Sequence, residues 1–133
     1  MSTSTHEVKK IDDMEAIYRG AFKRARAELG VESFGMQIID MPPGYENYPE
    51  HDHAHDNQEE VFIALRGGGE IEIAGERYPL DGDHVARVSA ATKRKVWPGD
   101  EGIRVLVLGG VPGAAYEPAD ITKLGEPDPM AES

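Results

Sequence analysis

The sequence predicts an all-β fold, a small jelly-roll β-barrel with a short N-terminal helix. Two observations support this prediction. Between residues 34 and 108, apolar residues form short runs, several with the period of two that strands show. Clusters of Gly, Pro and Asp separate these runs at intervals of about eight to twelve residues. About eight short strands on about 85 residues close most naturally as a jelly roll.

Length, charge and composition narrow the class of protein. The chain has 133 residues, a formal net charge of −11 and no cysteine. We expect one domain with one core, without disulfides or thiolate metal sites. The negative charge makes nucleic acid and anionic membranes poor partners. No signal-like apolar core opens the chain and no apolar run approaches the length of a membrane helix, so we expect a cytoplasmic protein.

Four segments follow from the composition along the chain. Residues 1–10 are polar, and we expect disorder there. Residues 11–32 form a helical segment, because apolar residues at 14–29 follow a helical stripe that ends at Gly30. Gly20 leaves open a division of this helix into two pieces. Residues 33–116 form the barrel, and the acidic, Pro-containing tail at 117–133 lies over the surface or is loose.

The strands of the barrel are expected between turn signals. Residues 59–65 are apolar on both faces, so both faces must be covered, by the helix, a second sheet or another subunit. This favours a homodimer. Ala74 and Gly75 predict a β-hairpin turn. Further turns are expected at 67–69, 81–83 and 98–100, and further strands at 34–38, 70–73, 76–80, 84–88, 93–97 and 103–108.

Three histidines at alternate positions indicate a metal site. His51, His53 and His55 would share one face of an extended segment. Glu59 and Glu60 open the next apolar run. Imidazole and carboxylate together suit a divalent transition metal such as Fe, Zn, Ni or Mn rather than Mg or Ca alone.

The same stretch resembles the first motif of the single-domain cupins. The residues His53-Ala54-His55, then Glu60, then Gly67 have the spacing of that motif, and Gly82-Asp83 resembles the turn of the second motif. The resemblance covers roughly residues 33–112. It implies a metal held by histidines and Glu60, a small-molecule ligand, and, if the protein is an enzyme, dioxygenase, isomerase or decarboxylase chemistry.

Two departures from the family pattern leave the ligand set open. The third histidine of the family falls on Lys93 or Arg94, and neither side chain ligates a metal when protonated. The spacing from Gly44 favours His51 with His53, whereas the spacing to Glu60 favours His53 with His55. Either all three histidines bind with Glu60, or two of them do and other positions on the metal stay open.

Three functions are consistent with these residues. The first is a metal-binding cupin that acts on or senses a small organic molecule, with Arg94, Phe62 and Tyr48 as candidates for the substrate pocket. The second is a metal-free cupin that binds a small anionic ligand through Arg94 or Lys93, since a fixed positive charge can replace the ion. The third is a non-catalytic structural or interaction protein that keeps only the fold.

Overall fold

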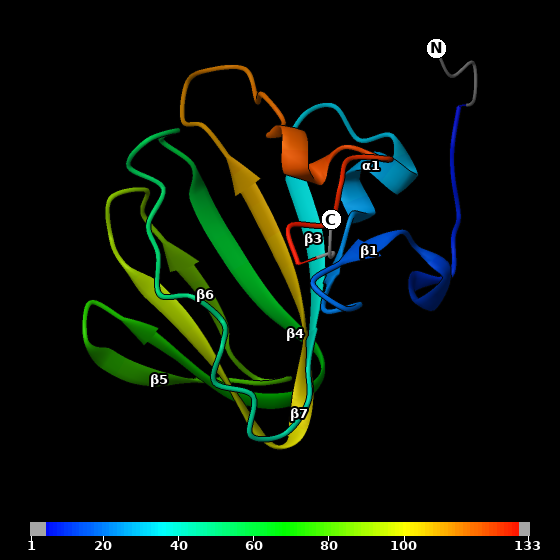
Figure 1. The fold of residues 1–133 in the computed structure, drawn as a ribbon. Helices are drawn as coiled ribbons and strands as arrows, with labels where there is room; N and C mark the ends of the chain where they lie inside the picture. Colours follow the sequence, from blue (N-terminus) through cyan, green and yellow to red (C-terminus); the bar gives the residue numbers. More distant parts are fainter. Residues whose placement is uncertain (1–4, 131–133) are drawn as a thin grey trace.

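The chain is mostly β-structure, as the sequence predicts, and its strands form one antiparallel sheet (Figure 1). The computed structural model describes residues 5–130. The predictions for residues 1–4 and for the last three residues of the tail therefore concern residues outside the described part. Within it, seven strands join in the order β1-β2-β3-β7-β4-β5, with β6 paired to β4. The elements are η1 (Ile11–Asp13), β1 (Ala16–Ile17), β2 (Phe22–Lys23), α1 (Ala25–Leu29), β3 (Gly35–Met41), β4 (Glu59–Ile73), β5 (Glu76–Leu80), β6 (Val85–Val88), β7 (Arg94–Gly110) and η2 (Asp120–Thr122).

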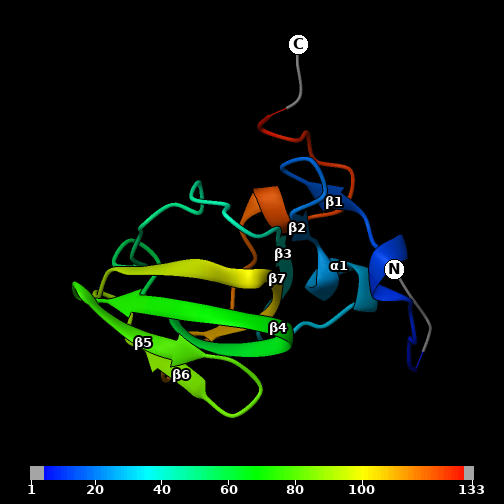
Figure 2. The same cartoon turned by 90° about the horizontal axis from the view of Figure 1, so that it is seen from below.

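Two long strands hold the sheet together and bend it. β4 and β7 pair along almost their whole lengths, with register shifts after Ala64 and after Gly67. The first part of β4 also pairs with β6, and its last part pairs with β5. Bulges of this kind bend a strand and increase its twist. The sheet therefore curves around a concave face (Figure 2).

The structure corrects the predicted turns at 67–69 and 98–100. Both segments lie inside long strands, and Gly69 pairs directly with Pro98. The glycines permit a close approach of two backbones: a Cβ on Gly69 would lie 2.0 Å from the carbonyl oxygen of Trp97. By contrast, the predicted hairpin at Ala74-Gly75 is confirmed, with both residues at positive φ between β4 and β5.

The sheet is not closed, so the predicted barrel is only partly confirmed. β1 and β5 end the strand order and do not pair with each other. The loop 42–58 runs along the open side (Figure 1). The loop forms no strand there, and its β-bridge to the sheet joins His51 and Arg94. A single bridge satisfies far fewer backbone groups than a strand, so this side stays open.

The predicted continuous helix over residues 14–29 is wrong. Tyr18, Arg19 and Gly20 all have positive φ, which an α-helix excludes, and they form the turn between β1 and β2. Within residues 14–29, only α1 is α-helical. The predicted stop is correct: Gly30 has φ 76° and its N–H donates to the carbonyl oxygens of Arg26 and Ala27.

Two apolar clusters hold these elements together. The larger lies within the curved sheet and includes Phe62, Ile71, Leu80 and Val105, each fully buried. The smaller packs Met14 and Ala25 of the N-terminal segment against Ile38 of β3. The N-terminal segment thus covers one face of β3 although it is not a continuous helix.

The described part of the tail lies against the N-terminal segment, as both views show (Figures 1 and 2). Buried Arg24 donates from Nε to the carbonyl oxygen of Ile121 at 2.8 Å. The Gly125 N–H donates to Glu15 at 2.8 Å. These contacts hold the N-terminal segment and residues 121–125 together at one side of the sheet. None of the helices among residues 5–130 has the length and apolar character needed to span a membrane.

Candidate metal centre and the cavity beside it

The backbone of the loop 42–58 fixes the positions of two histidines. His51 and Arg94 exchange backbone hydrogen bonds of 3.0 and 2.8 Å. Two residues further on, the His53 N–H donates to the carbonyl oxygen of Ala90 at 2.7 Å. The alternation of an extended chain then directs both imidazoles to the same side. Their ring centroids lie 5.2 Å apart.

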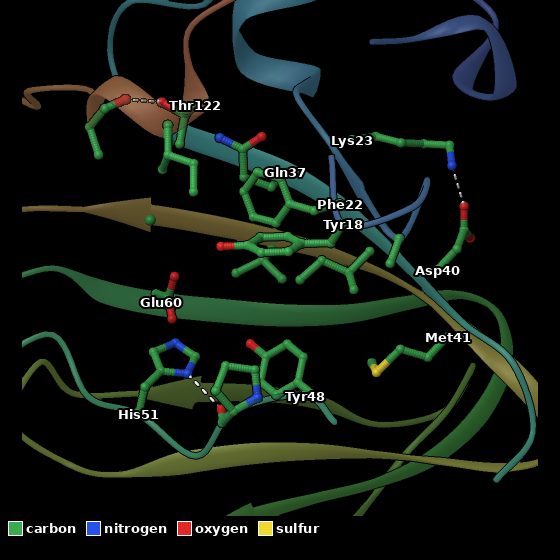
Figure 3. A pocket seen from close by; sticks show the side chains of 18 of the residues that line it. Tyr18, Phe22, Lys23, Gln37, Asp40, Met41, Tyr48, His51, Glu60 and Thr122 are labelled. Carbon is green, nitrogen blue, oxygen red and sulfur yellow. Dashed lines mark hydrogen bonds and ion pairs between the residues drawn. The ribbon is translucent and has the colours of Figure 1, made fainter. Parts of the chain in front are cut away.

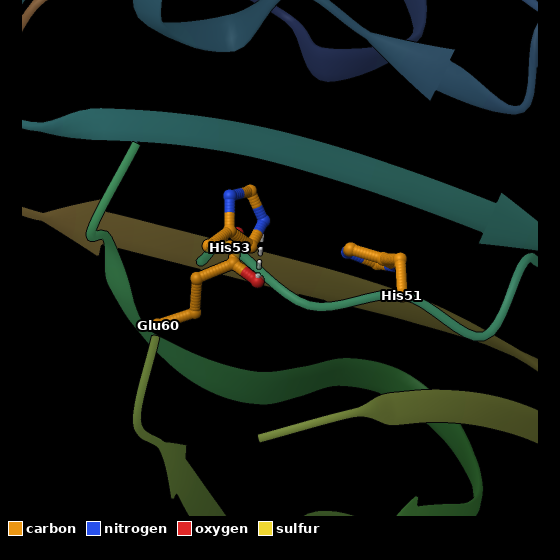
Figure 4. Close-up of side chains that lie close together, drawn as sticks. All are labelled: His51, His53 and Glu60. Atoms are coloured by element: carbon orange, nitrogen blue, oxygen red, sulfur yellow. Dashed lines mark ion pairs between the residues drawn. The ribbon is translucent and has the colours of Figure 1, made fainter. Parts of the chain in front are cut away.

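Glu60 approaches from β4 and completes a cluster of three ligand-type side chains (Figure 4). It is buried, and its neighbours across the sheet are Gly109 in β7 and Val88 in β6. One potential ligand atom each from His51, His53 and Glu60 lies within 4.8 Å of the others. His53 Nε2 is 3.2 Å from Glu60 Oε1. The structure thus brings together the histidine pair that the upstream spacing favours.

Both imidazoles are held through Nδ1. His51 Nδ1 lies 2.9 Å from the carbonyl oxygen of Pro49, and His53 Nδ1 lies 3.1 Å from a carboxylate oxygen of Asp56. The Gln58 amide donates to the other Asp56 oxygen at 2.9 Å. A metal-binding histidine typically uses one ring nitrogen in this way and offers the other to the ion. The arrangement therefore presents Nε2 of both rings.

The charges of the cluster stabilise one another. Interaction with Glu60 raises the pKa of His53 above its ordinary value, although partial burial opposes the positive charge. Burial disfavours the Asp56 carboxylate, but the hydrogen bond and charge of His53 outweigh it and lower the pKa of Asp56. His53 therefore lies between two carboxylates, one at each ring nitrogen.

Arg94 lies beneath the cluster and does not reach the cavity. Its side chain is fully buried, with Nη1 3.6 Å from Glu60 Oε1 and Nη2 donating to the Ser89 carbonyl oxygen at 2.8 Å. Among the described residues, Arg94 Nε and Nη1 have no hydrogen-bond partner. Arg94, one residue after the family's third-histidine position at Lys93, thus supplies a positive charge behind Glu60, not a metal ligand.

The three donors fit a divalent transition metal. Glu60 Oε1 is buried and, beyond its ion pairs with His53 and Arg94, accepts no hydrogen bond from a described residue. Donor atoms bound to one ion at about 2.1 Å lie about 3 to 3.5 Å apart. Small side-chain movements therefore suffice to bring the 4.8 Å cluster onto an ion.

His55 takes part in a second, more exposed grouping. Its side chain is 75 % exposed, and its Nε2 lies 3.4 Å from Asp56. His55, His53 and Asp56 also satisfy the distance condition for a metal cluster. Asp56 is already bonded by His53 and Gln58, however. The better-enclosed set is His51, His53 and Glu60.

A cavity of about 1270 Å³ opens beside the cluster (Figure 3). The expected pocket residue Tyr48 lines it, next to His51, with ring centroids 5.6 Å apart. Burial, with a smaller effect of the Glu60 charge, raises the pKa of Tyr48 above its ordinary value, so the phenol keeps its proton. Phe62 and Arg94 are fully buried elsewhere and do not line this cavity, and Lys93 is exposed outside it.

Residues from both ends of the chain also form the cavity wall. Tyr18, Phe22 and Lys23 come from the segment expected to be helical, and Tyr116 and Ile121 come from the segment after β7. Sequence reasoning missed them because no local pattern indicates that two segments so distant in sequence meet. Gly35 in β3 is a partial signal: a Cβ there would lie 2.9 Å from the Tyr116 hydroxyl oxygen.

Comparison with known proteins supports the fold. No protein-family model matches the sequence, and no curated protein does. A solved cupin protein from Bacteroides fragilis is 20 % identical, with a TM-score of 0.66 over 90 % of this chain and 95 % of that chain.

Two further solved structures agree over a smaller part of this chain. An RmlC-like cupin from Desulfovibrio desulfuricans is 25 % identical, with a TM-score of 0.52 over 59 % of this chain and 73 % of that chain. A predicted oxalate decarboxylase from Thermotoga maritima is 17 % identical, with a TM-score of 0.53 over 60 % of this chain and 68 % of that chain. Together with the curved antiparallel sheet, these likenesses show that the chain has the fold of a small cupin domain.

Proposed function

We propose that this protein is a metal-binding cupin that acts on or senses a small organic molecule in the cavity. The observation that carries the proposal is the convergence of His51, His53 and Glu60 at the cavity wall, with Nδ1 of both imidazoles already bonded. Two histidines and one carboxylate leave positions on a metal free for a ligand. An ion of Fe, Zn, Ni or Mn there would polarise a carbonyl or carboxylate oxygen or, if redox-active, support oxygen chemistry.

The surrounding residues have separate tasks in this proposal. Asp56 and Gln58 fix the orientation of His53, and Arg94 supports the ionised form of Glu60 from behind. The curved sheet, the N-terminal segment and the segment after β7 would enclose the ligand and reduce its contact with water. The fold is shared with a predicted oxalate decarboxylase and with a DMSP lyase from Ruegeria pomeroyi. Decarboxylase, dioxygenase and isomerase chemistry all stay open for this chain.

The metal-free alternative has less support. It assigns an anionic ligand to Arg94 or Lys93, but neither residue lines the cavity. Arg94 also has a carboxylate beside it already, 3.6 Å from Nη1. An added anion would have to displace Glu60 from a buried guanidinium.

Elemental mass spectrometry of the purified protein tests the metal site. We expect a near-stoichiometric divalent transition metal, lost on chelation and absent from His53→Ala. His84→Ala is the matched control, because His84 also pairs with an aspartate but is 53 % exposed and lies outside the cluster. His55→Ala separates the two ligand sets: retained metal supports the His51, His53 and Glu60 site. Wild-type protein that binds no metal, even after loading with divalent ions, would contradict the proposal.

A further inference from the structure

Tyrosine is concentrated at the cavity. Of the five tyrosines in the chain, four line it: Tyr18, Tyr45, Tyr48 and Tyr116. Among the described residues, none of these four hydroxyls has a hydrogen-bond partner, whereas the hydroxyl of Tyr78, which lies outside the cavity, donates to Glu76 at 2.9 Å. Tyr48 is buried and the other three are half-buried, and buried tyrosine hydroxyls usually find a partner. Unpartnered hydroxyls around one cavity indicate a ligand that offers hydrogen-bonding groups between apolar surfaces.

Tyr48 is the member of this group nearest the metal cluster. The residue is only 9 % exposed, and its ring lies beside that of His51 (Figure 3). A phenol both donates and accepts a hydrogen bond. In this position, Tyr48 can bond an oxygen of a ligand whose neighbouring oxygen faces His51 and Glu60.

Much of the remaining cavity wall is apolar, and its buried lysine is already paired with a carboxylate. Phe22, Ile39, Met41, Val107 and Ile121 provide apolar surface. The one buried cation in the wall, Lys23, pairs with Asp40 at 2.7 Å and donates to the Gly20 carbonyl oxygen at 3.0 Å. Arg19 lies in an exposed turn. Carboxylates of Asp40, Asp56 and Glu60 also face the cavity, so a small, highly charged anion has little to bind there besides the metal.

The volume of the cavity suits a ligand larger than a two-carbon acid. Pockets for drug-sized ligands have volumes of about 300 to 1,000 Å³, and this cavity has about 1270 Å³. A two-carbon acid would leave most of that volume to water. A ring-containing molecule would cover the apolar wall and gain free energy from each apolar surface removed from water.

We propose that the cavity takes an uncharged amphipathic molecule with an aromatic body and two adjacent oxygens, held with its oxygens at the His51–His53–Glu60 cluster and positioned by Tyr48. This inference rests on the proposed metal site for the oxygen end of the ligand. The aromatic end depends only on the tyrosine and apolar wall. The two parts can therefore be tested separately.

Isothermal titration calorimetry with two probes tests the ligand class. The first is 2,3-dihydroxynaphthalene, which has an aromatic body and adjacent oxygens, and the second is oxalate, which has chelating oxygens and no body. With metal-loaded protein, we expect the naphthalenediol to bind at least about ten-fold more tightly than oxalate. After metal removal, we expect weaker but measurable naphthalenediol binding and no oxalate binding. Tighter binding of oxalate by the loaded protein would overturn the inference while leaving the metal proposal intact.

Two pairs of variants test whether the naphthalenediol binds in the cavity and beside Tyr48. Ala119→Trp fills the cavity from an exposed position, and Ala114→Trp makes the same change at an exposed position outside it. We expect Ala119→Trp to weaken naphthalenediol binding more than about ten-fold and Ala114→Trp to leave it unchanged. Tyr48→Phe, compared with Tyr78→Phe, should weaken it about three- to ten-fold, as expected for one lost hydrogen bond.

The metal content of every variant is measured alongside its affinity. Unchanged naphthalenediol binding in Ala119→Trp would overturn the inference, because the probe would then lie elsewhere. If the wild type holds no metal but its naphthalenediol binding is lost in Ala119→Trp, the metal proposal fails and the aromatic cavity stands.

Discussion

At the residue scale, the surroundings of a histidine separate a candidate metal ligand from a surface histidine better than the local sequence around it does. His53 and His84 each lie three residues from a partner aspartate, with Nδ1 3.1 and 2.8 Å from it. The side chain of His53 is 17 % exposed and has Glu60 at its other nitrogen, whereas that of His84 is 53 % exposed. Of these two histidines, only His53 combines an oriented ring with a second ligand-type side chain. The same local pair is therefore part of the proposed metal site in one place and a surface contact in the other.

Asp56→Asn tests whether the orientation of His53 matters for metal binding. Loss of the carboxylate weakens the hold on Nδ1, and such changes typically cost about 10- to 100-fold in metal affinity. We expect an effect of this size in a competition titration with a metal-binding dye. Asp81→Asn is the matched control at His84. Equal affinities of Asp56→Asn and wild type would show that the aspartate has no part in the site.

At the element scale, a glycine in β7 makes room for the residues behind the site. Gln58 is buried against Gly109, where a Cβ would lie 2.5 Å from Gln58 Oε1. The neighbouring Gly110 has nothing within 4 Å of such a Cβ. The absence of one side chain in β7 thus allows Gln58 to reach Asp56.

Gly109→Ala should therefore disturb the His51–His53–Glu60 cluster without replacing any of its three side chains. The new methyl group displaces Gln58, which then loses its hydrogen bond to Asp56. We expect metal affinity to fall several-fold, on the same scale as other changes around metal ligands. Gly110→Ala should behave as wild type in the same titration. A loss of affinity in both variants would indicate a general effect on β7 instead.

The glycines at 67–69 also have a structural role at this scale. Because Gly69 packs against Trp97 and Gly99 of β7, Gly69→Ala forces two backbones apart. Overpacking of this kind costs about 1 to 3 kcal/mol. We expect a loss of at least this size in urea unfolding. Gly82→Ala, in an open turn with no atom near the new Cβ, should be close to neutral. A neutral Gly69→Ala would contradict the pairing of these strands.

At the scale of the whole molecule, an ionic network joins four segments. Arg104 of β7 bonds Asp12 of η1 and Asp40 of β3, and Asp40 also pairs with Lys23 of β2. Burial opposes the charge of Asp40, but hydrogen bonds from Arg104 and Lys23 outweigh it and lower its pKa. The hydrogen bond from Arg104 likewise lowers the pKa of Asp12. The network thus holds the N-terminal segment on the sheet.

This network predicts acid sensitivity. A carboxyl whose pKa is lower in the folded state contributes stability that is fully present above its unfolded value of about 3.9, and this stability is lost as the pH falls towards the folded value. We expect Asp40→Asn to cost about 1 to 3 kcal/mol at pH 7 and to lose less further stability below pH 4 than wild type. Urea unfolding as a function of pH checks this. Asp83→Asn, at an exposed site without an ion-pair partner among the described residues, is the control. A parallel acid profile for Asp40→Asn and wild type would contradict the assignment.

The homodimer stays a prediction, and an apolar strip favours it. Val61 and Ile63 on the outer face of β4 are only partly covered, and Val85, opposite Ile63 in β6, is 71 % exposed. At its edge, Arg87 lies 3.6 Å from Glu59, so the face carries both charges and can complement a second copy of itself. Light scattering at micromolar concentration should give a dimer mass, reduced by Val85→Glu but not by Val8→Glu, which changes an exposed valine on the N-terminal segment. A monomeric wild type would remove the prediction.

The elements that local sequence determines were predictable. The short apolar run at residues 59–65 indicates a strand that is covered on both faces. Ala74 and Gly75 specify a hairpin because both adopt positive φ in a tight turn. Gly30 ends a helix for the same reason. The spacing of His53 and Glu60 likewise indicated the part of the chain in which the structure brings ligand-type side chains together.

The remaining features depend on contacts between residues far apart in sequence. The choice of His51 over His55 follows from one backbone bridge to Arg94, 43 residues further along the chain by their numbers. The glycines at 67–69 resemble a turn until β7 lies beside them. The cavity needs Tyr18 and Tyr116 from opposite ends of the chain. Sequence alone therefore determined the mainly β fold class and the residue types of the candidate metal site, because both depend on local periodicity and residue type. Tertiary structure decided which of these side chains come together and where the cavity lies, because these depend on which distant segments pack together.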